Sequence, residues 1–138
     1  MQSSFASAQQ PLLLIDESLS DRAVAQALCL VDYNAQAVRD VLSPGVDDPS
    51  LIRWLGLQAG VWVTADDKAK KQHADAMNKA GIHVLWIRRP KSGLSKKGQL
   101  LLLLWVLDEI LDQLSTAKGP RWFTAQFSGK RPKWYRIQ

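Results

Sequence analysis

The sequence predicts an α/β fold in which helices pack around a mainly parallel sheet. The strongest observation is a set of short apolar runs typical of strands buried on both faces: LLLI (residues 12–15), VWVTA (61–65) and IHVLWI (82–87). Segments with apolar residues at three- to four-residue spacing separate these runs, as in amphipathic helices. Strands that alternate with helices at this spacing favour a parallel sheet between helical layers. With 138 residues, the chain is long enough for one domain with its own core.

The first part of the chain predicts one strand followed by one helix. The strand over residues 12–15 ends at Asp16, and apolar residues at helical spacing from residue 19 to residue 31 predict a helix after it. Residues 32–45 show little periodicity, and a short strand within residues 35–41 is the only element that we expect there.

The middle of the chain predicts two more helices, one on each side of the strand over residues 61–65. We expect Asp48 to cap the first of them, Pro49 to occupy its first helical position and Gly60 to stop it. The second is predicted over residues 68–80, where Gly81 is a residue that helices favour just past their last turn.

The last third of the chain predicts a long helix and a β-hairpin. The helix runs from residue 95 to about residue 115, and its broad apolar surface indicates deep burial or a partner helix. Apolar or aromatic residues then alternate with polar ones around a turn with Gly and Pro, which is typical of a hairpin. We therefore expect a disordered tail (residues 1–11) and a single domain (12–138), with a core (12–115) and a basic, aromatic hairpin (118–138).

Charge is distributed unevenly along the chain. The net charge is +5, but residues 1–87 contain seven basic and ten acidic side chains (net −3), whereas residues 88–138 contain eleven basic and three acidic ones (net +8). Carboxylates in one half and cations in the other suit a protein that holds a metal cation and a polyanion. The alternative is that the two halves simply have solvent-exposed surfaces of different charge. Charge alone does not distinguish this interpretation from binding of a cation and a polyanion.

The composition favours a cytoplasmic protein that does not enter a membrane. Cys29 is the single cysteine, so neither an internal disulfide nor a cysteine metal cluster can form. The longest apolar run, residues 100–107, is much shorter than the roughly 20 residues that cross a bilayer.

Three aspartates are predicted to meet at one edge of the sheet. Asp16 and Asp66 each follow a strand, and open parallel sheets bind ligands beyond the carboxyl ends of their strands. Asp48, at a helix start, is expected to reach the same edge. Carboxylates this close repel one another unless a divalent cation neutralises them. Oxygen ligands without histidine or cysteine favour Mg²⁺ or Mn²⁺, which can activate a water for attack on a phosphodiester.

Each of these acids also has a structural interpretation. Asp48 is well placed to cap a helix, and Asp66 with Asp67 fits a turn followed by a cap. Asp16 is harder to explain in this way, because a charge at the end of a buried strand is costly without a partner. Glu17 either supports a metal through water or places a favourable charge at a helix N-terminus.

The order and spacing of three motifs resemble those of the PIN-like domains, most closely the compact branch of VapC-type toxins. The motifs are LLLIDESLS, DDPSLI and VWVTADDKAKK, and the resemblance covers residues 12–89. It implies a Rossmann-like three-layer α/β/α sandwich and a metal-dependent ribonuclease. It also implies Asp16, Asp48 and Asp66 as metal ligands, with Asp67 as a further catalytic acid.

Three residues next to these ligands are candidate supporting positions, namely Glu17, Ser18 and Thr64. Two positions depart from the family pattern. Ser18 stands where the branch often has asparagine, and Asp67 lies one position before the last acid of the family motif, whose following aromatic residue is missing here.

Basic residues near the acids are candidates for binding RNA phosphates. Lys68 lies beside the acid pair, and Arg88, Arg89 and Lys91 follow a strand that should end at the same edge. The aromatic residues of the hairpin either stack on unpaired bases or cover the core. His73 is expected to be a half-buried member of a helix stripe, outside the site.

The function that we expect is a Mg²⁺- or Mn²⁺-dependent endoribonuclease that acts as the toxin of a toxin–antitoxin pair. Its partners would be RNA and a cognate antitoxin protein. The apolar surface at residues 100–107 suits either a homodimer or a groove for the antitoxin. The alternative is a catalytically inactive PIN-like module that binds RNA or protein.

Overall fold

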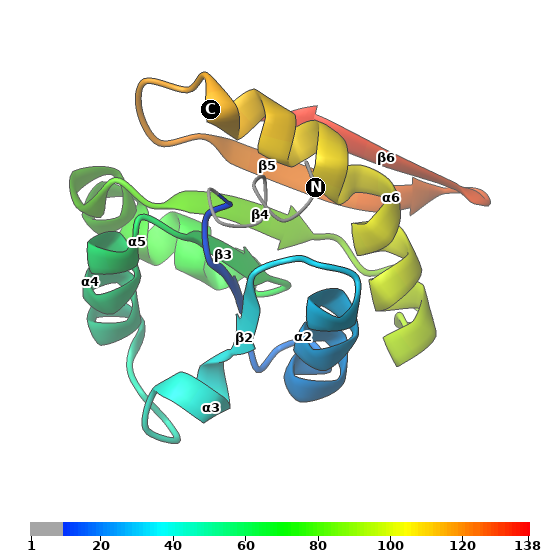
Figure 1. The fold of residues 1–138 in the computed structure, drawn as a ribbon, viewed down its shortest axis with the longest axis horizontal. Helices are drawn as coiled ribbons and strands as arrows, with labels where there is room; N and C mark the ends of the chain where they lie inside the picture. The colour runs from blue at the N-terminus through cyan, green and yellow to red at the C-terminus, as the bar shows by residue number, and fades with distance from the viewer. Residues whose placement is uncertain (1–9) are drawn as a thin grey trace.

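A computed structural model describes residues 10–138, apart from the side chains of residues 69–71. Its centre is a six-stranded sheet with the strand order β2-β1-β3-β4-β5-β6 (Figure 1). The strands are β1 (Leu13–Ile15), β2 (Ala35–Ala37), β3 (Val61–Thr64), β4 (His83–Ile87), β5 (Trp122–Ser128) and β6 (Arg131–Arg136). The first five are parallel, and β6 pairs antiparallel with β5. The predicted mainly parallel sheet and C-terminal hairpin are confirmed.

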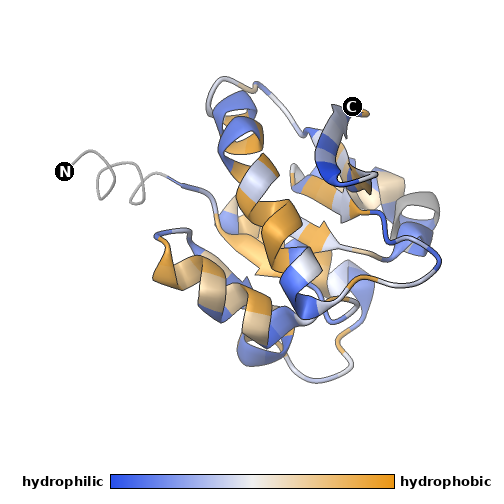
Figure 2. Cartoon of the chain, turned by 90° about the vertical axis from the view of Figure 1, so that its right-hand side faces the viewer, coloured by the Kyte–Doolittle hydropathy of each residue, from blue (hydrophilic) through white to orange (hydrophobic). Residues whose placement is uncertain are grey.

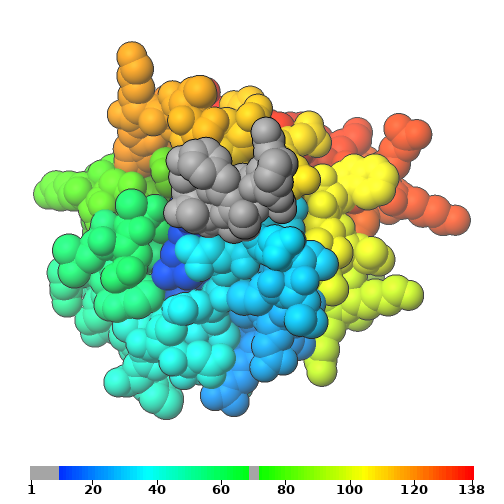
Figure 3. Space-filling model, viewed as in Figure 1, coloured from blue at the N-terminus to red at the C-terminus, as the bar shows by residue number. Residues whose placement is uncertain are grey.

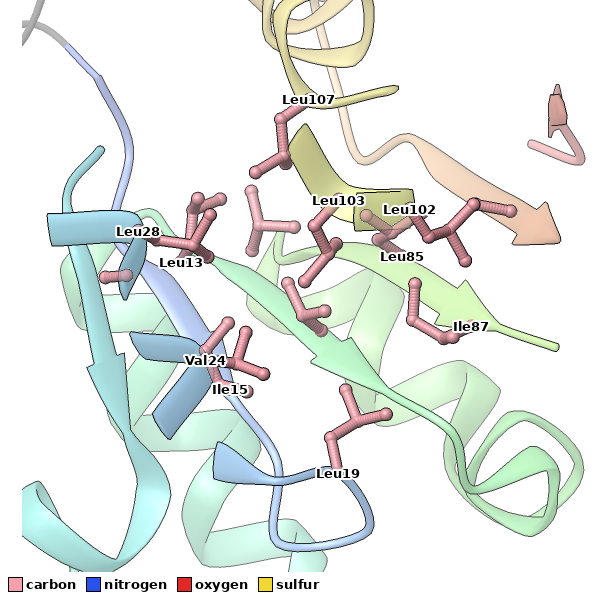
Figure 4. Close-up of a cluster of buried hydrophobic side chains, with 14 of the residues drawn as sticks. Leu13, Ile15, Leu19, Val24, Leu28, Leu85, Ile87, Leu102, Leu103 and Leu107 are labelled. Carbon is pink, nitrogen blue, oxygen red and sulfur yellow. The ribbon is translucent and has the colours of Figure 1, made fainter. Parts of the chain in front are cut away.

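Helices cover both faces of this sheet. They are α2 (Asp21–Leu30), α3 (Val38–Val41), α4 (Asp48–Gln58), α5 (Asp67–Ala80) and α6 (Lys96–Ser115). Buried side chains of α2 and α6 pack on one face, and those of α4 and α5 pack on the other. Figure 4 shows the first of these cores, where Leu103 of α6 lies close to Leu85 of β4, and Val24 of α2 lies beside Ile15 of β1.

The continuous apolar runs of the strands follow from the two helical layers. Leu13 and Ile15 belong to the core under α2 and α6, and Leu14 belongs to the core under α4 and α5. Successive side chains of a strand point to opposite faces, so a strand between two helical layers needs apolar residues at every position. All residues of β1 and β3 are buried.

The chain between α4 and β3 passes so close to Leu55 of α4 and to the backbone before β1 that it needs a glycine. The helix ends at Gln58, its C-cap Ala59 has a left-handed backbone (φ 52°), and Gly60 then leads into β3. A Cβ atom at Gly60 would lie 2.4 Å from Leu55 Cδ1 and 2.8 Å from the carbonyl oxygen of Leu12. Gly60 therefore follows the end of the helix, as predicted, and the reason for a glycine there is packing, because the left-handed backbone belongs to Ala59.

The weakly patterned segment contains the predicted short strand, β2, and also the four-residue helix α3, which periodicity does not reveal. Of the tail predicted over residues 1–11, residues 1–9 lie outside the part of the chain that the structure describes. Within the described part of the chain, no helix combines the length and apolarity needed to cross a membrane.

The aromatic residues of the hairpin mostly cover the core. Trp122 and Phe123 are buried, and Phe127 and Trp134 are half-buried against the same cores. Tyr135 is the exception, at 47% exposed. The sequence left open whether these aromatic residues stack on unpaired bases or cover the core. Core packing accounts for four of the five side chains.

Candidate active site

The carboxyl ends of β1 and β3 form the point at which the strand order of the sheet reverses. β1 lies between β2 on one side and β3 on the other, although β2 and β3 follow each other in the chain. Asp16 directly follows β1, and Asp66 lies two residues after β3. Open α/β sheets bind ligands at such a reversal point, and the two strand-end aspartates both lie at this edge.

The Asp16 side chain is fixed by three hydrogen bonds. Trp62 Nε1 donates to Oδ1 at 3.2 Å, and Thr64 Oγ1 and the backbone N–H of Ser18 each donate to Oδ2 at 3.1 Å. The register explains two of these bonds, because Leu14 pairs with Trp62 and residues two apart on a strand point to the same face. A carboxylate has about four acceptor positions, so about one remains for a ligand.

Two hydroxyl groups connect the loops that follow β1 and β3. Thr64 Oγ1 is buried, donates to Asp16 and accepts from the backbone N–H of Asp66 at 3.1 Å. Ser18 Oγ must therefore donate in its 3.3 Å contact with Thr64 Oγ1, and it accepts from the backbone N–H of Ala65 at 2.9 Å. The supporting role of Ser18 and Thr64 stays a prediction, with these contacts as its structural basis.

The two consecutive aspartates after β3 occupy different positions. Asp66 is the N-cap of α5, and its Oδ1 accepts from the backbone N–H of Lys68 at 2.9 Å. Its carbonyl oxygen accepts from Trp86 Nε1 at 3.3 Å, which connects this loop to β4. Asp67 is the first residue of α5 and is exposed. The structural interpretation with Asp67 as the cap is therefore wrong, because Asp66 has that position.

The expected cap of α4 is also displaced by one residue. Asp47 is the N-cap, and its Oδ1 accepts from the backbone N–H of Ser50 at 2.7 Å. Hydrogen bonds from the side chain and the backbone of Ser50 lower the pKa of Asp47. Asp48 is the first helical residue and Pro49 the second. The predictions of Asp48 as the cap and of Pro49 as the first helical residue are therefore wrong by one position, because proline is tolerated in the first helical turn and does not fix which aspartate is the cap. Asp48 is therefore not needed as a cap.

The Asp48 carboxylate is half-buried and interacts with other charged groups. Burial is the largest cause of its raised pKa, and the negative charges of Asp16 and Asp66 raise it further. His73 acts in the opposite direction, with Nε2 3.6 Å from Asp48 Oδ2. Asp16 and Asp66 are therefore both close enough to Asp48 to act on its charge.

His73 belongs to this edge, which the sequence did not predict. Its side chain is half-buried, as expected for its stripe, but it faces Asp48. It lies where the backbone of α5 departs from helical geometry (φ −128°, ψ 20°). α4 and α5 pack against each other on one face of the sheet, and this contact brings His73 to the start of α4. No local motif encodes a contact between two helices that a strand separates in the chain.

The predicted RNA-binding cations surround this edge. Arg89 Nη1 donates to the carbonyl oxygen of Ser18 at 3.0 Å, so it lies against the loop that follows β1. Arg88 and Lys91 are exposed after β4, the parallel neighbour of β3, and Lys68 is exposed in the first turn of α5. Glu17 is exposed in the loop after β1. Glu17 interacts electrostatically with Arg39, and the side chains of Lys68, Arg88 and Lys91 extend into solvent.

The aspartates have the chemistry of Mg²⁺ ligands, but they do not form a closed cage. In the part of the chain that the structure describes, no three Asp, Glu, His or Cys side chains form a group that could hold a metal ion. Mg²⁺ commonly keeps several waters and binds one or two carboxylates together with substrate phosphates, so a cage is not required. The raised pKa of Asp48 fits a cation here, because a positive charge would offset the repulsion from Asp16 and Asp66.

No known protein family, curated protein or solved structure matches this chain. Its function therefore has to be argued from its own residues. Two features of these residues bear on function: the order of the three sequence motifs, and the position of Asp48 at the reversal point of the sheet, where Asp16 and Asp66 act on its charge.

Proposed function

We propose that the chain is a metal-dependent ribonuclease of the PIN-like type, with Asp16, Asp48 and Asp66 as ligands of Mg²⁺ or Mn²⁺. The observation that carries this proposal is the placement of half-buried Asp48 near Asp16 and Asp66 at the reversal point of the sheet, where burial and then these two negative charges raise the pKa of Asp48. Groups with perturbed pKa values gather at functional sites, where the cost of holding them is offset by their use.

The three aspartates have different tasks in this proposal. Trp62 and Thr64 hold Asp16 in one orientation, so its remaining acceptor position has a fixed direction. The capping bond to Lys68 orients Asp66, and Asp48 brings a third negative charge from α4. When bound, the metal ion supplies an activated water and stabilises the charge that develops on the phosphodiester. Asp67 adds an exposed acid next to Asp66.

Basic residues provide the second part of the proposed site. Arg88, Arg89, Lys68 and Lys91 lie around the acidic edge and would hold the phosphates on either side of the scissile bond. The net charge of +8 over residues 88–138 would raise the local concentration of a polyanion such as RNA. We further propose that the protein acts in the cytoplasm as the toxin of a toxin–antitoxin pair.

A second candidate function is an RNA-binding or protein-interaction module without turnover. The observation that favours it is the use of Asp16 as a structural connector, since its carboxylate already accepts three hydrogen bonds from the chain itself. In that case Asp16 would join β1 to β3, and the acidic edge would not bind a metal.

An RNA cleavage assay in Mg²⁺ or Mn²⁺ separates the two candidates. We expect the wild type to cut RNA only with the metal, and Asp16→Asn and Asp66→Asn to lower the rate at least about 100-fold, because each removes a ligand charge. Asp75→Asn, at an exposed position of α5, is the matched control and should cut like the wild type. Intact RNA binding without metal-dependent cutting would instead identify the module.

A further inference from the structure

α6 exposes an apolar patch that no described part of the chain covers. Leu101, Leu104 and Trp105 are 49%, 37% and 67% exposed, whereas the neighbouring Leu102 and Leu103 are fully buried. Figure 2 shows hydrophobic residues through the middle of this helix and hydrophilic residues toward its ends. Adjoining exposed apolar side chains of this size mark interaction surfaces.

Charged residues extend this patch at both ends into a stripe, which we call the α6 stripe. Its members are exposed, and their spacing of mostly three or four residues places them within an arc of about 100° around the helix axis. They are Lys97, Leu101, Leu104, Trp105, Asp108 and Asp112. The α6 stripe is therefore basic at its N-terminal end, apolar in its middle and acidic at its C-terminal end.

This order of charges is the reverse of the order that stabilises an isolated helix. The helix dipole favours acidic residues in the first turn and basic residues in the last. α6 has neither: Lys96 and Lys97 begin it, and Asp112 lies near its end. The unfavourable arrangement along one helix becomes favourable when a second helix with the same order lies antiparallel to it.

We propose that the α6 stripe is the two-fold interface of a homodimer in which two α6 helices pack antiparallel. With the axis between Leu104 and Trp105, the Lys97 end of each copy lies opposite the Asp112 end of the other. The same contact is then made twice, as a two-fold interface requires. The acidic end of the α6 stripe also disfavours RNA as the occupant, because a polyanion would be repelled there.

A hollow next to the α6 stripe extends the proposed interface onto the hairpin. It has a volume of about 460 Å³ and is lined by Leu101, Trp105, Phe127, Lys130, Arg131 and Pro132. Figure 3 shows α6 in yellow and the hairpin in red on the same side of the molecular surface. Antiparallel pairing places Asp108 of the second copy opposite Leu101, and therefore near the positive charges of Lys130 and Arg131. One oxygen of Asp108 accepts a hydrogen bond from the hydroxyl of Tyr33 in its own copy, and the carboxylate has further acceptor positions.

The size of this surface sets the expected affinity. A contact from residue 97 to residue 112 is about 24 Å long, so together with the hairpin it falls near the lower limit of specific interfaces, about 1,200 Å² in total. We therefore expect a dissociation constant of about 1–100 µM.

Sedimentation equilibrium of the full chain tests the proposal without reference to RNA cleavage. We expect the wild type to dimerise and Trp105→Glu to be monomeric at about 500 µM. Lys97→Glu and Asp112→Lys should each weaken the dimer about tenfold, and the double variant should recover most of the loss, because both charge pairs are restored with exchanged signs. Leu57→Glu, at an 86% exposed leucine of α4, is the control and should dimerise normally.

Two outcomes would overturn the proposal. One is a wild type that remains monomeric at about 500 µM. The other is a dimer that Trp105→Glu leaves intact, or whose charge variants do not compensate each other, since either result would place the interface on another surface. Circular dichroism of each variant shows that the fold is retained.

Discussion

Asp16 and Asp48 lie at the same edge of the sheet, but their charges are compensated very differently. Asp16 follows a strand, and the paired strand supplies it with hydrogen-bond donors from Trp62 and Thr64. Asp48 begins a helix, has His73 at 3.6 Å and is repelled by the other aspartates. The difference indicates that Asp16 contributes to the stability of this edge, whereas burial and the neighbouring aspartates make the ionised form of Asp48 unfavourable. The proposed function would explain why such a charge is kept at this edge.

The largest expected effect is the loss of the Asp16 connection. Asp16→Ala leaves the indole N–H of Trp62, the hydroxyl of Thr64 and the backbone N–H of Ser18 without their acceptor. We expect the free energy of unfolding to fall by about 2–3 kcal/mol, because these donors bind a charged group. Urea denaturation measures this change. A loss below about 0.5 kcal/mol would mean that the hydrogen bonds of Asp16 do not stabilise this edge, and would remove the contrast with Asp48.

A smaller effect is expected at the hydroxyl that orients Asp16. Thr64→Val keeps the shape of a buried side chain but removes its bonds to Asp16 and to the backbone N–H of Asp66. We expect a loss of about 1–2 kcal/mol in the same measurement. Thr124→Val on β5 is the matched control, because Thr124 Oγ1 is buried and has no hydrogen-bond partner among the described residues. Equal losses in the two variants would contradict the assigned role of Thr64.

Much of this fold is predictable from the sequence because of where the strands lie. β1, β3 and β4 are covered on both faces, so they read as uninterrupted apolar runs and end at visible polar residues. α3 has only four residues, which is too short for a period of 3.6 residues to become apparent. The hairpin is visible through its alternation and its turn, but which aromatic residues face the core depends on the position of α6.

The candidate site is only partly predictable, for a similar reason. Asp16 and Asp66 are marked by the strands that precede them. The position of Asp48 depends on which of two adjacent aspartates caps α4, and His73 reaches it only through the packing of α4 against α5. The α6 stripe is also only partly predictable. The spacing of its residues is visible in the sequence, but their exposure depends on the tertiary structure.

The smallest effect is expected for the charge of Asp48 itself. The folded protein raises the pKa of Asp48 above its ordinary value of 3.8, so the ionised carboxylate lowers stability at pH 7 and this cost disappears as the pH falls through the folded-state pKa. Asp48→Asn should therefore be more stable than the wild type by about 0.5 kcal/mol at pH 7, a small value because solvent screens a side chain that is one third exposed.

The pH dependence of that difference can be followed by urea denaturation in EDTA, which keeps metal ions away from the site. We expect the advantage of Asp48→Asn to shrink as the pH is lowered from 7 to about 4, where Asp48 of the wild type becomes neutral as well. An advantage that grows toward low pH would have the wrong sign for a raised pKa.

The most direct test of the account measures RNA cleavage and stability on the same preparation of Asp48→Asn. We predict a variant that is at least as stable as the wild type but cuts RNA at least about 100-fold more slowly in Mg²⁺ or Mn²⁺. Such a result would show that the charge of Asp48 is retained for catalysis. A variant that is stable and cuts RNA at the wild-type rate would contradict the central claim, as would a wild type that cuts no RNA in either metal.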